Sequence, residues 1–316
     1  MISFRYHIVS IVSVFLALAV GVALGGGPLK REVDDTLVQQ VEADRKAKAD
    51  LRNQVTALGA GNEFTDDFAR TVATGLLDQT LAGRTVTVVV LPDADQDSVS
   101  STRKLVGSAG GSVGATIRLA DKLLDVGNKQ LVDELATQLL AGAEGVTGAE
   151  DQGTYERLGA LLARATATPE DAGAAPDDTG SSILSGLSTA ELLTTDGEVN
   201  RRGSLVLFLG GGDPADADAR ESASAVVSAM ARSMDAASDG AVLAGTVASA
   251  RPDGAVEAIR GDVVTAQEVS TVDTLDRVAG QVVAVLALAE QGRGGVGHYG
   301  SVDAANGTMP EPATTQ

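Results

Sequence analysis

An uncharged apolar segment near the start of the sequence constrains the fold of this chain more than any other feature. Residues 8–24, IVSIVSVFLALAVGVAL, contain no charged side chain, and the uncharged stretch continues to residue 29. An α-helix rises about 1.5 Å per residue, so roughly 20 such residues cross the hydrocarbon core of a bilayer. The segment therefore predicts a membrane anchor over residues 1–29. Its apolar surface would be made by Ile8, Phe15, Leu16, Leu18 and Leu24.

Two other uses of this segment stay open at the level of sequence. Ala17-Leu18-Ala19 has the small-residue spacing of a signal-peptidase site, although it lies inside the apolar segment and not after it. A pore would need several copies of the chain, because one helix cannot enclose a water path. Ser10 and Ser13 are the only polar side chains between residues 8 and 24. A simple anchor needs the fewest assumptions.

The charges around the segment bear on its orientation. Arg5 precedes it, and Lys30 and Arg31 follow it, directly before several acidic residues. Positive residues favour the cytoplasmic side of a membrane, and this balance gives only a weak bias. We expect a single-pass protein of the cell membrane with a cytoplasmic N-terminus and an extracytoplasmic body. If the segment is cleaved instead, an outer-envelope location follows.

The composition excludes several classes of protein. The chain has 24 Lys and Arg residues against 43 Asp and Glu residues, a formal net charge of -19, whereas a nucleic-acid partner requires a basic surface. Cysteine is absent, and only two histidines and four methionines could bind a soft metal. His7 lies at the predicted membrane and His298 in a polar tail, so we find no general base. We expect no enzyme activity and no resident cofactor.

A charged, helix-prone segment over residues 30–60 follows the anchor. Apolar residues recur in it with the 3.5-residue spacing of a coiled-coil seam, and Asp44 and Lys48 interrupt that spacing. The apolar seam residues are Leu37, Val41, Leu51, Val55 and Leu58. Two interpretations stay open. The segment could dimerise the protein as a membrane-proximal coiled coil, or it could pack as one amphipathic helix on its own domain.

Residues 61–291 alternate between strand and helix patterns. Near-continuous β-branched or aliphatic runs such as TVTVVVL are typical of strands buried on both faces of a parallel sheet. We predict a doubly wound, mostly parallel α/β body with helices on both faces and a loop over residues 166–182. Strands are expected at residues 85–91, 112–119, 205–209, 241–247 and 262–265. Helices are expected at residues 62–81, 98–109, 121–141, 154–165, 214–234 and 273–291. A further helix is expected after the loop, ending at residue 193. Residues 292–316 lack apolar periodicity and predict a disordered tail.

Two short motifs could carry chemistry. Gly210, Gly211 and Gly212 follow a predicted buried strand and precede a helix, where doubly wound folds bind phosphate on exposed amides. The same residues are also explained locally, by Asp213 as a helix cap and Pro214 in the first helical turn. The acidic string DADQD at residues 93–97 could hold Mg²⁺ or simply be a solvated loop. Met230 and Met234 share one helix face, as core residues often do.

Two strings resemble a known family. MISFRYH with SIVSVFLALAVGVALGGGPL, over residues 1–29, and VSTVDTLDRVAGQVVAVLALAE, over residues 269–290, look like the actinobacterial MctB family, also called mycobacterial copper transport protein B. The resemblance implies an envelope protein that limits copper accumulation, with a proposed channel role and copper as the transported ion. Some relatives act in corynebacterial cell division as the membrane partner of a septal protein. No catalytic or metal-binding residue has a motif position here to inherit.

Two functional hypotheses follow. In the first, the chain takes part in copper export or copper homeostasis, as an oligomer or together with a pore protein. In the second, it is a non-transporting extracytoplasmic scaffold, which dimerises through residues 30–60 and docks an envelope or cell-division partner. Both hypotheses predict a membrane protein that assembles into a homo-oligomer or a hetero-complex.

Overall fold

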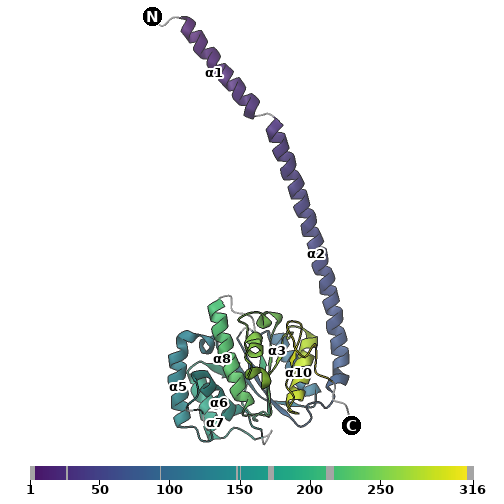
Figure 1. The fold of residues 1–316 in the computed structure, drawn as a ribbon, viewed down its shortest axis with the longest axis vertical. Helices are drawn as coiled ribbons and strands as arrows, with labels where there is room; N and C mark the ends of the chain where they lie inside the picture. Colours follow the sequence, from purple (N-terminus) through teal and green to yellow (C-terminus); the bar gives the residue numbers. More distant parts are fainter. Residues whose placement is uncertain are drawn as a thin grey trace. The chain divides into compact units, whose positions relative to one another are not determined.

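The computed structural model describes residues 4–25, 28–92, 94–146, 149, 151–169, 174–210 and 217–311 (Figure 1). The side chains of residues 28–36 and 217 are outside this description. The chain divides into two compact units, Met1–Phe64 and Thr65–Gln316. The structure is of the mixed α/β class, with an apolar N-terminal helix and a mostly parallel sheet, as the sequence predicts.

The first unit contains helix α1, Phe4–Gly25, and most of helix α2, Pro28–Leu77. The sequence predicts separate helices over residues 30–60 and 62–81, whereas α2 is continuous through both segments. Gly59 and Gly61 each weaken a helix by about 1 kcal/mol relative to Ala, but they do not break it. No proline occurs between Pro28 and Pro92, so nothing in the segment forbids a helical backbone.

The second unit is built on a seven-stranded sheet in the order β3-β2-β1-β4-β5-β6-β7. Neighbouring strands are parallel except β3, which pairs antiparallel with β2. The central strands β1 and β4 are buried throughout, which explains their aliphatic runs. The strands are β1 Thr85–Val90, β2 Ser112–Leu119, β3 Leu193–Thr195, β4 Leu205–Leu209, β5 Ala241–Ala244, β6 Ser270–Val272 and β7 His298–Tyr299.

Alternate residues of the sheet face two separate hydrophobic clusters. Val206 and Phe208 of β4 join the cluster under α5, α6, α7, α8 and α9. Leu205 and Leu207 join the cluster under α3, α10 and the end of α2. Figure 1 shows α5 to α8 gathered on one side of this unit and α3 and α10 on the other. These helices are α3 Gln96–Ser108, α5 Lys129–Ala141, α6 Thr154–Thr166, α7 Asp178–Thr189, α8 Ala217–Asp235, α9 Ala255–Gly261 and α10 Val278–Gln291.

Several predicted boundaries were wrong. Residues 262–265 are not a strand; they lead into the short helix η3, Thr265–Gln267, and the next strand is β6. The helix expected at residues 121–141 is broken into α4, Asp121–Leu124, η1, Val126–Asn128, and α5. The Asp125 carboxylate accepts the N–H of Gly127 at 2.8 Å, which starts η1 and ends α4. Inside the predicted loop 166–182, α7 already begins at Asp178.

The segment expected to be a disordered tail is folded as far as residue 311. Tyr299 is only 3% exposed, and β7 pairs in parallel with β6. Residues 312–316 lie outside the described part of the chain. The prediction failed because it rested on apolar periodicity, whereas polar contacts fix this segment.

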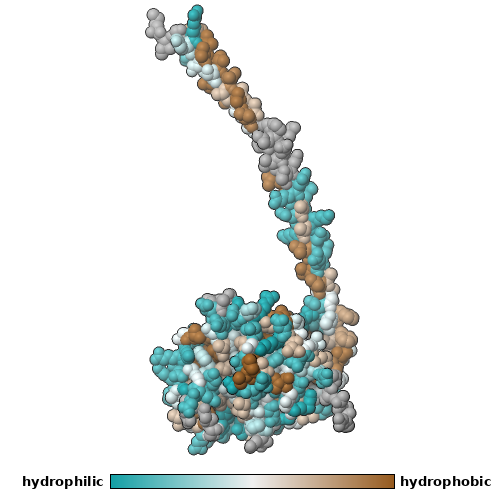
Figure 2. Space-filling model, in the orientation of Figure 1, coloured by the Kyte–Doolittle hydropathy of each residue, from teal (hydrophilic) through white to brown (hydrophobic). Residues whose placement is uncertain are grey.

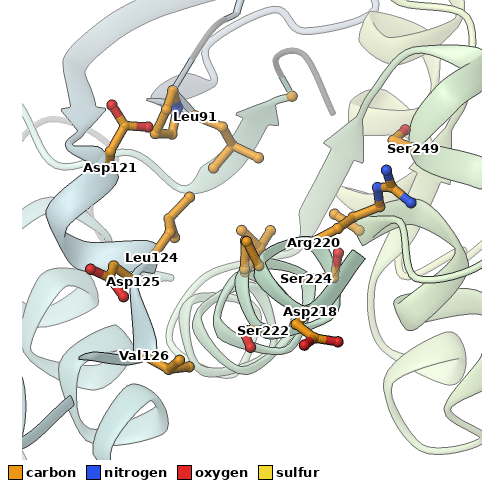
Figure 3. A pocket seen from close by; sticks show the side chains of 16 residues that line it. Leu91, Asp121, Leu124, Asp125, Val126, Asp218, Arg220, Ser222, Ser224 and Ser249 are labelled. Atoms are coloured by element: carbon orange, nitrogen blue, oxygen red, sulfur yellow. The ribbon is translucent and has the colours of Figure 1, made fainter. Parts of the chain in front are cut away.

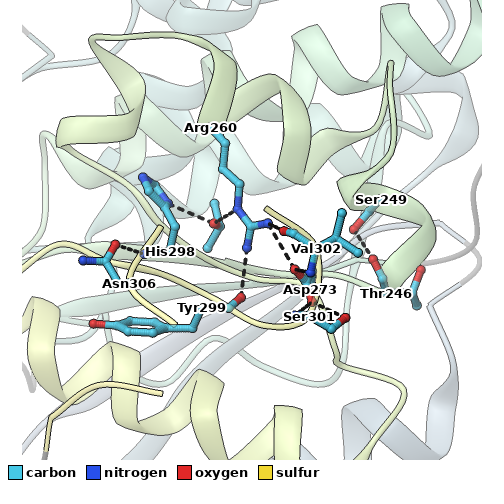
Figure 4. A network of polar contacts seen from close by, with 10 residues as sticks. Thr246, Ser249, Arg260, Asp273, His298, Tyr299, Ser301, Val302 and Asn306 are labelled. Atoms are coloured by element: carbon cyan, nitrogen blue, oxygen red, sulfur yellow. Dashed lines mark hydrogen bonds and ion pairs between the residues drawn. The ribbon is translucent and has the colours of Figure 1, made fainter. Parts of the chain in front are cut away.

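A buried ion pair holds the C-terminal segment against the sheet (Figure 4). Asp273 is fully buried and pairs with Arg260 at 3.1 Å between Oδ2 and Nη1. The same carboxylate accepts the N–H of Ser301 at 2.7 Å and that of Val302 at 3.1 Å. Gly300 has φ +138°, and a Cβ there would lie 2.1 Å from the Asp273 carboxylate. A glycine is therefore needed for the backbone to wrap around Asp273.

Candidate functional site

Helix α1 is the one described helix that is long and apolar enough to span a membrane. An 18-residue window of this 22-residue helix has a mean hydropathy of 2.6, and all residues of the helix are exposed. The predicted anchor residues Ile8, Phe15, Leu16, Leu18 and Leu24 all lie on it. The face drawn in Figure 2 is mainly apolar along α1. An apolar helix with no protein core to cover it fits a membrane anchor.

Ser13 is one of two polar side chains in the apolar part of α1, and its hydroxyl is bonded within the helix. The hydroxyl of Ser13 donates to the carbonyl oxygen of Val9 at 2.8 Å, within the same helix. That bond satisfies the hydroxyl hydrogen without a neighbouring helix. From Ile8 to Gly25 a single α1 therefore presents a mainly apolar surface to its surroundings.

The predicted seam residues lie exposed on α2. Leu37, Val41, Leu51, Val55 and Leu58 are between 47% and 69% exposed. Nothing within the first unit covers them, so a second chain or the body of the same chain would have to bury these residues, and packing on its own domain stays a prediction. The coiled coil itself stays a prediction, because a second chain would have to supply the partner helix.

A cavity of about 430 Å³ opens where the central strands of the sheet end (Figure 3). The chain leaves β1 toward β2 on one side and leaves β4 toward β5 on the other. The loops after β1 and β4 therefore diverge, which in parallel α/β sheets creates a crevice at the carboxyl ends of the strands. Residues that follow four different strands line the cavity: Leu91 after β1, Asp121 after β2, Gly210 after β4 and Ser249 after β5.

Part of the glycine motif falls at this cavity. Gly210 lines it, and its N–H donates to the carbonyl oxygen of Ala244 at 2.6 Å. A Cβ on Gly210 would lie 3.1 Å from the Cα of Gly245, so a glycine lets β4 and β5 end close together. The Gly210 amide is thus committed to the sheet and is not available to an anion. Gly211 and Gly212 lie outside the described residues, so an anion site there stays a prediction.

The cavity combines an apolar wall with carboxylates. Asp121, Asp125 and Asp218 line it together with Arg220, and Figure 3 shows Asp121 and Asp125 across the cavity from Arg220. Both oxygens of Asp125 accept hydrogen bonds from within η1. We did not predict this set from the sequence, because Asp121, Asp125 and Asp218 resemble ordinary acidic residues at helix starts.

The other candidates have local structural explanations. Asp95 of the acidic string accepts the N–H of Ser98 at 2.8 Å and so caps α3, and this hydrogen bond lowers the pKa of Asp95. Asp93 lies outside the described residues. Met230 and Met234 are fully buried in the core, as their spacing predicts. Among the described residues no group of three or more His, Asp or Glu side chains could hold a metal ion.

His298 was expected in a disordered tail, and that expectation was wrong. Its Nδ1 lies 2.9 Å from the Thr271 hydroxyl, and its Nε2 lies 3.0 Å from the Ala266 carbonyl oxygen. Burial lowers the pKa of His298, so the ring is neutral at physiological pH. Both ring nitrogens have protein partners, so His298 is a structural residue in this conformation and not an open metal ligand.

Comparison with known proteins relates the whole chain to one kind of envelope protein. A family model described as "Copper transport outer membrane protein, MctB" matches residues 1–310. Proteins named "Copper transporter MctB" from Mycobacterium tuberculosis and Mycobacterium bovis are 32% identical over 313 residues, which cover 95% of this chain and 96% of theirs. The protein of that name from Mycobacterium leprae is 31% identical over 315 residues, with the same coverage.

Proposed function

This chain belongs to the MctB family of copper transport outer membrane proteins, and from that premise we propose that it works in copper homeostasis as a membrane-anchored protein of the cell envelope. The observation that carries the proposal is the extent of the match. It runs through the anchor, the long helix and the α/β body, so the relatives named for copper transport share this entire layout. We further propose that the N-terminus is cytoplasmic and the body extracytoplasmic.

Copper is the cargo in this proposal and not a resident cofactor. Copper prefers thiolate, thioether and imidazole ligands. In the described part of the chain, Met230 and Met234 are inside the core, Met309 packs partly buried against the second cluster, and His298 is bonded at both nitrogens, which leaves His7 on α1 as an exposed imidazole. Cysteine is absent. We therefore propose that the chain affects copper without a tight copper site of its own.

Channel activity, which the family resemblance also implies, would require an assembly. Among the described residues α1 is the one helix apolar enough to span a membrane, and it offers almost no polar lining, so several copies of α1 or a separate pore protein would have to form the path. Purified protein in liposomes provides the measurement. Copper flux that rises with the number of copies per vesicle would support a homo-oligomeric channel, and absence of flux at every density would contradict it.

Gene deletion with complementation tests the copper proposal. We expect the deletion strain to accumulate copper and to grow poorly in copper, and the wild-type chain to reverse both effects. A variant with His298→Gln and with Met230, Met234 and Met309 each replaced by Leu should also reverse them, since these substitutions nearly conserve volume. Cell-associated copper is measured by mass spectrometry and protein level by immunoblot.

Each result of this experiment has a clear meaning. Unchanged copper content after deletion contradicts a role in copper homeostasis. Failure of the His and Met variant at a normal protein level contradicts the statement that copper is not bound by these side chains.

The orientation of the chain in the membrane is tested with Ser100→Cys on the exposed side of α3. Because the native chain has no cysteine, labelling of intact cells by an impermeant maleimide reports this residue alone, and absence of labelling would contradict an extracytoplasmic body.

A second candidate function is favoured by the exposed seam on α2. We propose as the alternative that two chains pair through Leu37, Val41, Leu51, Val55 and Leu58 and dock an envelope or cell-division partner. Anchors in one membrane force such helices to run parallel. Val55→Cys at a seam position should then give a disulfide-linked dimer, while Asn53→Cys, off the seam, should not.

A charge in the seam tests the same pairing without cysteine chemistry. Leu51→Asp should abolish the Val55→Cys dimer, and Asn53→Asp, which adds the same charge outside the seam, should leave it intact. Equal dimer yields for the two variants would contradict the coiled coil.

A further inference from the structure

We propose that the cavity at the carboxyl ends of β1 and β4 binds an organic amine, a molecule with a protonated nitrogen and an apolar body. This site is separate from the proposed role in copper homeostasis, and neither proposal depends on the other. Four observations carry it: the position of the cavity in the sheet, its apolar wall, the hydrogen-bonding character of its polar groups, and the arrangement of its charges.

The position of the cavity is where open parallel sheets place ligands. Its lining follows the strands β1, β2, β4 and β5, and it opens between β1 and β4, where the chain turns in opposite directions. The helices after these two strands cover opposite faces, since α3 belongs to one hydrophobic cluster and α8 to the other. The cavity volume of about 430 Å³ is within the range of small-molecule pockets.

The wall of the cavity suits an apolar body. Leu91, Ala223 and Val227 form its buried part, at 8%, 9% and 2% exposure. Leu124 and Val126 extend the apolar surface toward the opening, where Val126 is 52% exposed. A ligand that covers this surface removes apolar area from water, which is favourable by about 25 cal/mol per Å².

The Arg220 guanidinium brings hydrogen-bond donors to the cavity, whereas Ser224, Ser249 and Asp121 offer acceptors. The Ser224 hydroxyl donates to the Asp253 carbonyl oxygen at 2.7 Å, and the Ser249 hydroxyl donates to the Thr246 carbonyl oxygen at 2.6 Å. Each serine can therefore only accept from a ligand. No hydrogen bond to the Asp121 carboxylate occurs among the described residues. A ligand that hydrogen-bonds to Asp121, Ser224 or Ser249 must therefore bring N–H or O–H donors.

The charges favour a cation over an anion. Asp121 and Asp125 face the cavity from α4 and η1, across from Arg220 (Figure 3). Arg220 already has an interaction partner, and Asp218 in the first turn of α8 offsets the positive end of that helix. The protein as a whole carries a formal charge of -19. We place the ligand nitrogen beside Asp121 and Asp125 and the apolar body against Ala223 and Val227.

Three probes with one tail and different head groups test the proposal. The full chain in zwitterionic nanodiscs is titrated at pH 7 with 4-phenylbutylamine, 4-phenylbutanol and 4-phenylbutyrate, and empty nanodiscs serve as blanks. Calorimetry is expected to give the amine about tenfold tighter binding than the carboxylate, with the alcohol between them, as opposite and like charges would produce.

Three variants locate the binding. Asp121→Asn should weaken amine binding about threefold and leave the alcohol unchanged, the size of effect typical of a partly exposed charge pair. Glu221→Gln is the matched control, because it removes one exposed carboxylate from α8 at a position that does not line the cavity. Glu221→Gln should change the affinity for neither the amine nor the alcohol. Ala223→Leu fills the buried end and should weaken both the amine and the alcohol.

Several outcomes would overturn the proposal. Carboxylate binding as tight as amine binding would point to an anion site, and no saturable binding of any probe would rule out the pocket. Equal losses for Asp121→Asn and Glu221→Gln would mean that diffuse negative charge, and not this cavity, attracts the amine. If Ala223→Leu does not fold, the exposed Asp121→Asn and Glu221→Gln pair still decides the question.

Discussion

In the part of α2 that belongs to the first unit, Leu37 and Val55 are 53% and 69% exposed, whereas Ala73, near the end of the helix, is 3% exposed. These residues are eighteen positions apart, which is five full turns of an α-helix, so they lie on one line along its surface. Ala73 is covered because its part of α2 belongs to the hydrophobic cluster with β1, α3 and α10. Helical periodicity therefore identifies which side of α2 is apolar, but not what covers that side.

The same contrast separates the two compact units. The second unit provides its own hydrophobic clusters on both faces of the sheet. The described side chains of the first unit include no buried residue, so this unit provides no hydrophobic core of its own, and we expect a bilayer and another chain to cover its apolar surfaces. Substitutions in the second unit should then change the free energy of unfolding, while substitutions in the first should change association. The variants below test this difference between the two units, in order of decreasing expected change in stability.

The largest loss in the free energy of unfolding is expected for Asp273→Ala. This substitution leaves the guanidinium of Arg260 buried without its counter-charge and removes the acceptor for the N–H groups of Ser301 and Val302. Breaking a buried pair in this way costs about 3–5 kcal/mol. Urea unfolding of the full chain, followed by far-ultraviolet circular dichroism, measures the loss.

Asp276→Ala is the matched control, because Asp276 is exposed and three residues away. It should change the free energy of unfolding by less than about 0.5 kcal/mol. Limited proteolysis adds a second readout, since cleavage should appear near residues 300–310 only in Asp273→Ala. Similar stability of the two variants would mean that the C-terminal segment is not part of the cooperative fold.

A pair of leucines on α2 tests the comparison directly. Leu77 is fully buried, and Leu51 is 61% exposed on the same helix. Leu77→Ala should lower the free energy of unfolding by about 3 kcal/mol, the usual cost of a cavity in a core. Leu51→Ala should lower it by less than about 0.5 kcal/mol and should instead weaken self-association. Equal destabilisation would show that residues 37–58 are covered by the body after all.

The parts of the fold that sequence predicts are those set by local apolar patterns. The run from Thr85 to Val90 and that from Leu205 to Leu209 were predicted because every residue in each is buried. Strand β3, with three residues, and β7, with two, are too short for any periodicity. The folded C-terminal segment was missed because Asp273 and Arg260 hold it, and a distant ion pair leaves no local pattern.

The cavity could be predicted even less from sequence. Its lining runs from Leu91 to Ala255 and becomes a single surface only through the strand order. Gly210 was noticed for its glycine neighbours, yet its amide serves the sheet and not an anion. A prediction that β1 and β4 are neighbours would have pointed to the crevice between their ends. The sequence contains no signal for that pairing, because both strands are equally apolar.

The smallest expected change in stability concerns Asp235, a partly buried carboxylate of the second unit. Asp235 accepts the N–H of Ala241 at 2.7 Å, and burial, with a smaller contribution from Glu268, raises the pKa of Asp235 to about 6. In the unfolded chain this group titrates near its ordinary value of about 3.8–3.9. Between about pH 4 and pH 6 the folded protein therefore keeps a proton that the unfolded chain has released. The stabilisation from Asp235 is complete below this window and is lost as the pH rises through 6.

Asp235→Asn removes this titration while its side-chain oxygen can still accept the N–H of Ala241. The variant should be about 1 kcal/mol more stable than the wild type at pH 7.5, less than the full pKa shift implies because the carboxylate keeps some contact with water. At pH 4 the two proteins should unfold at the same urea concentration. A gain from Asp235→Asn that is equal at both pH values would mean that the substitution acts through packing and not through a buried charge.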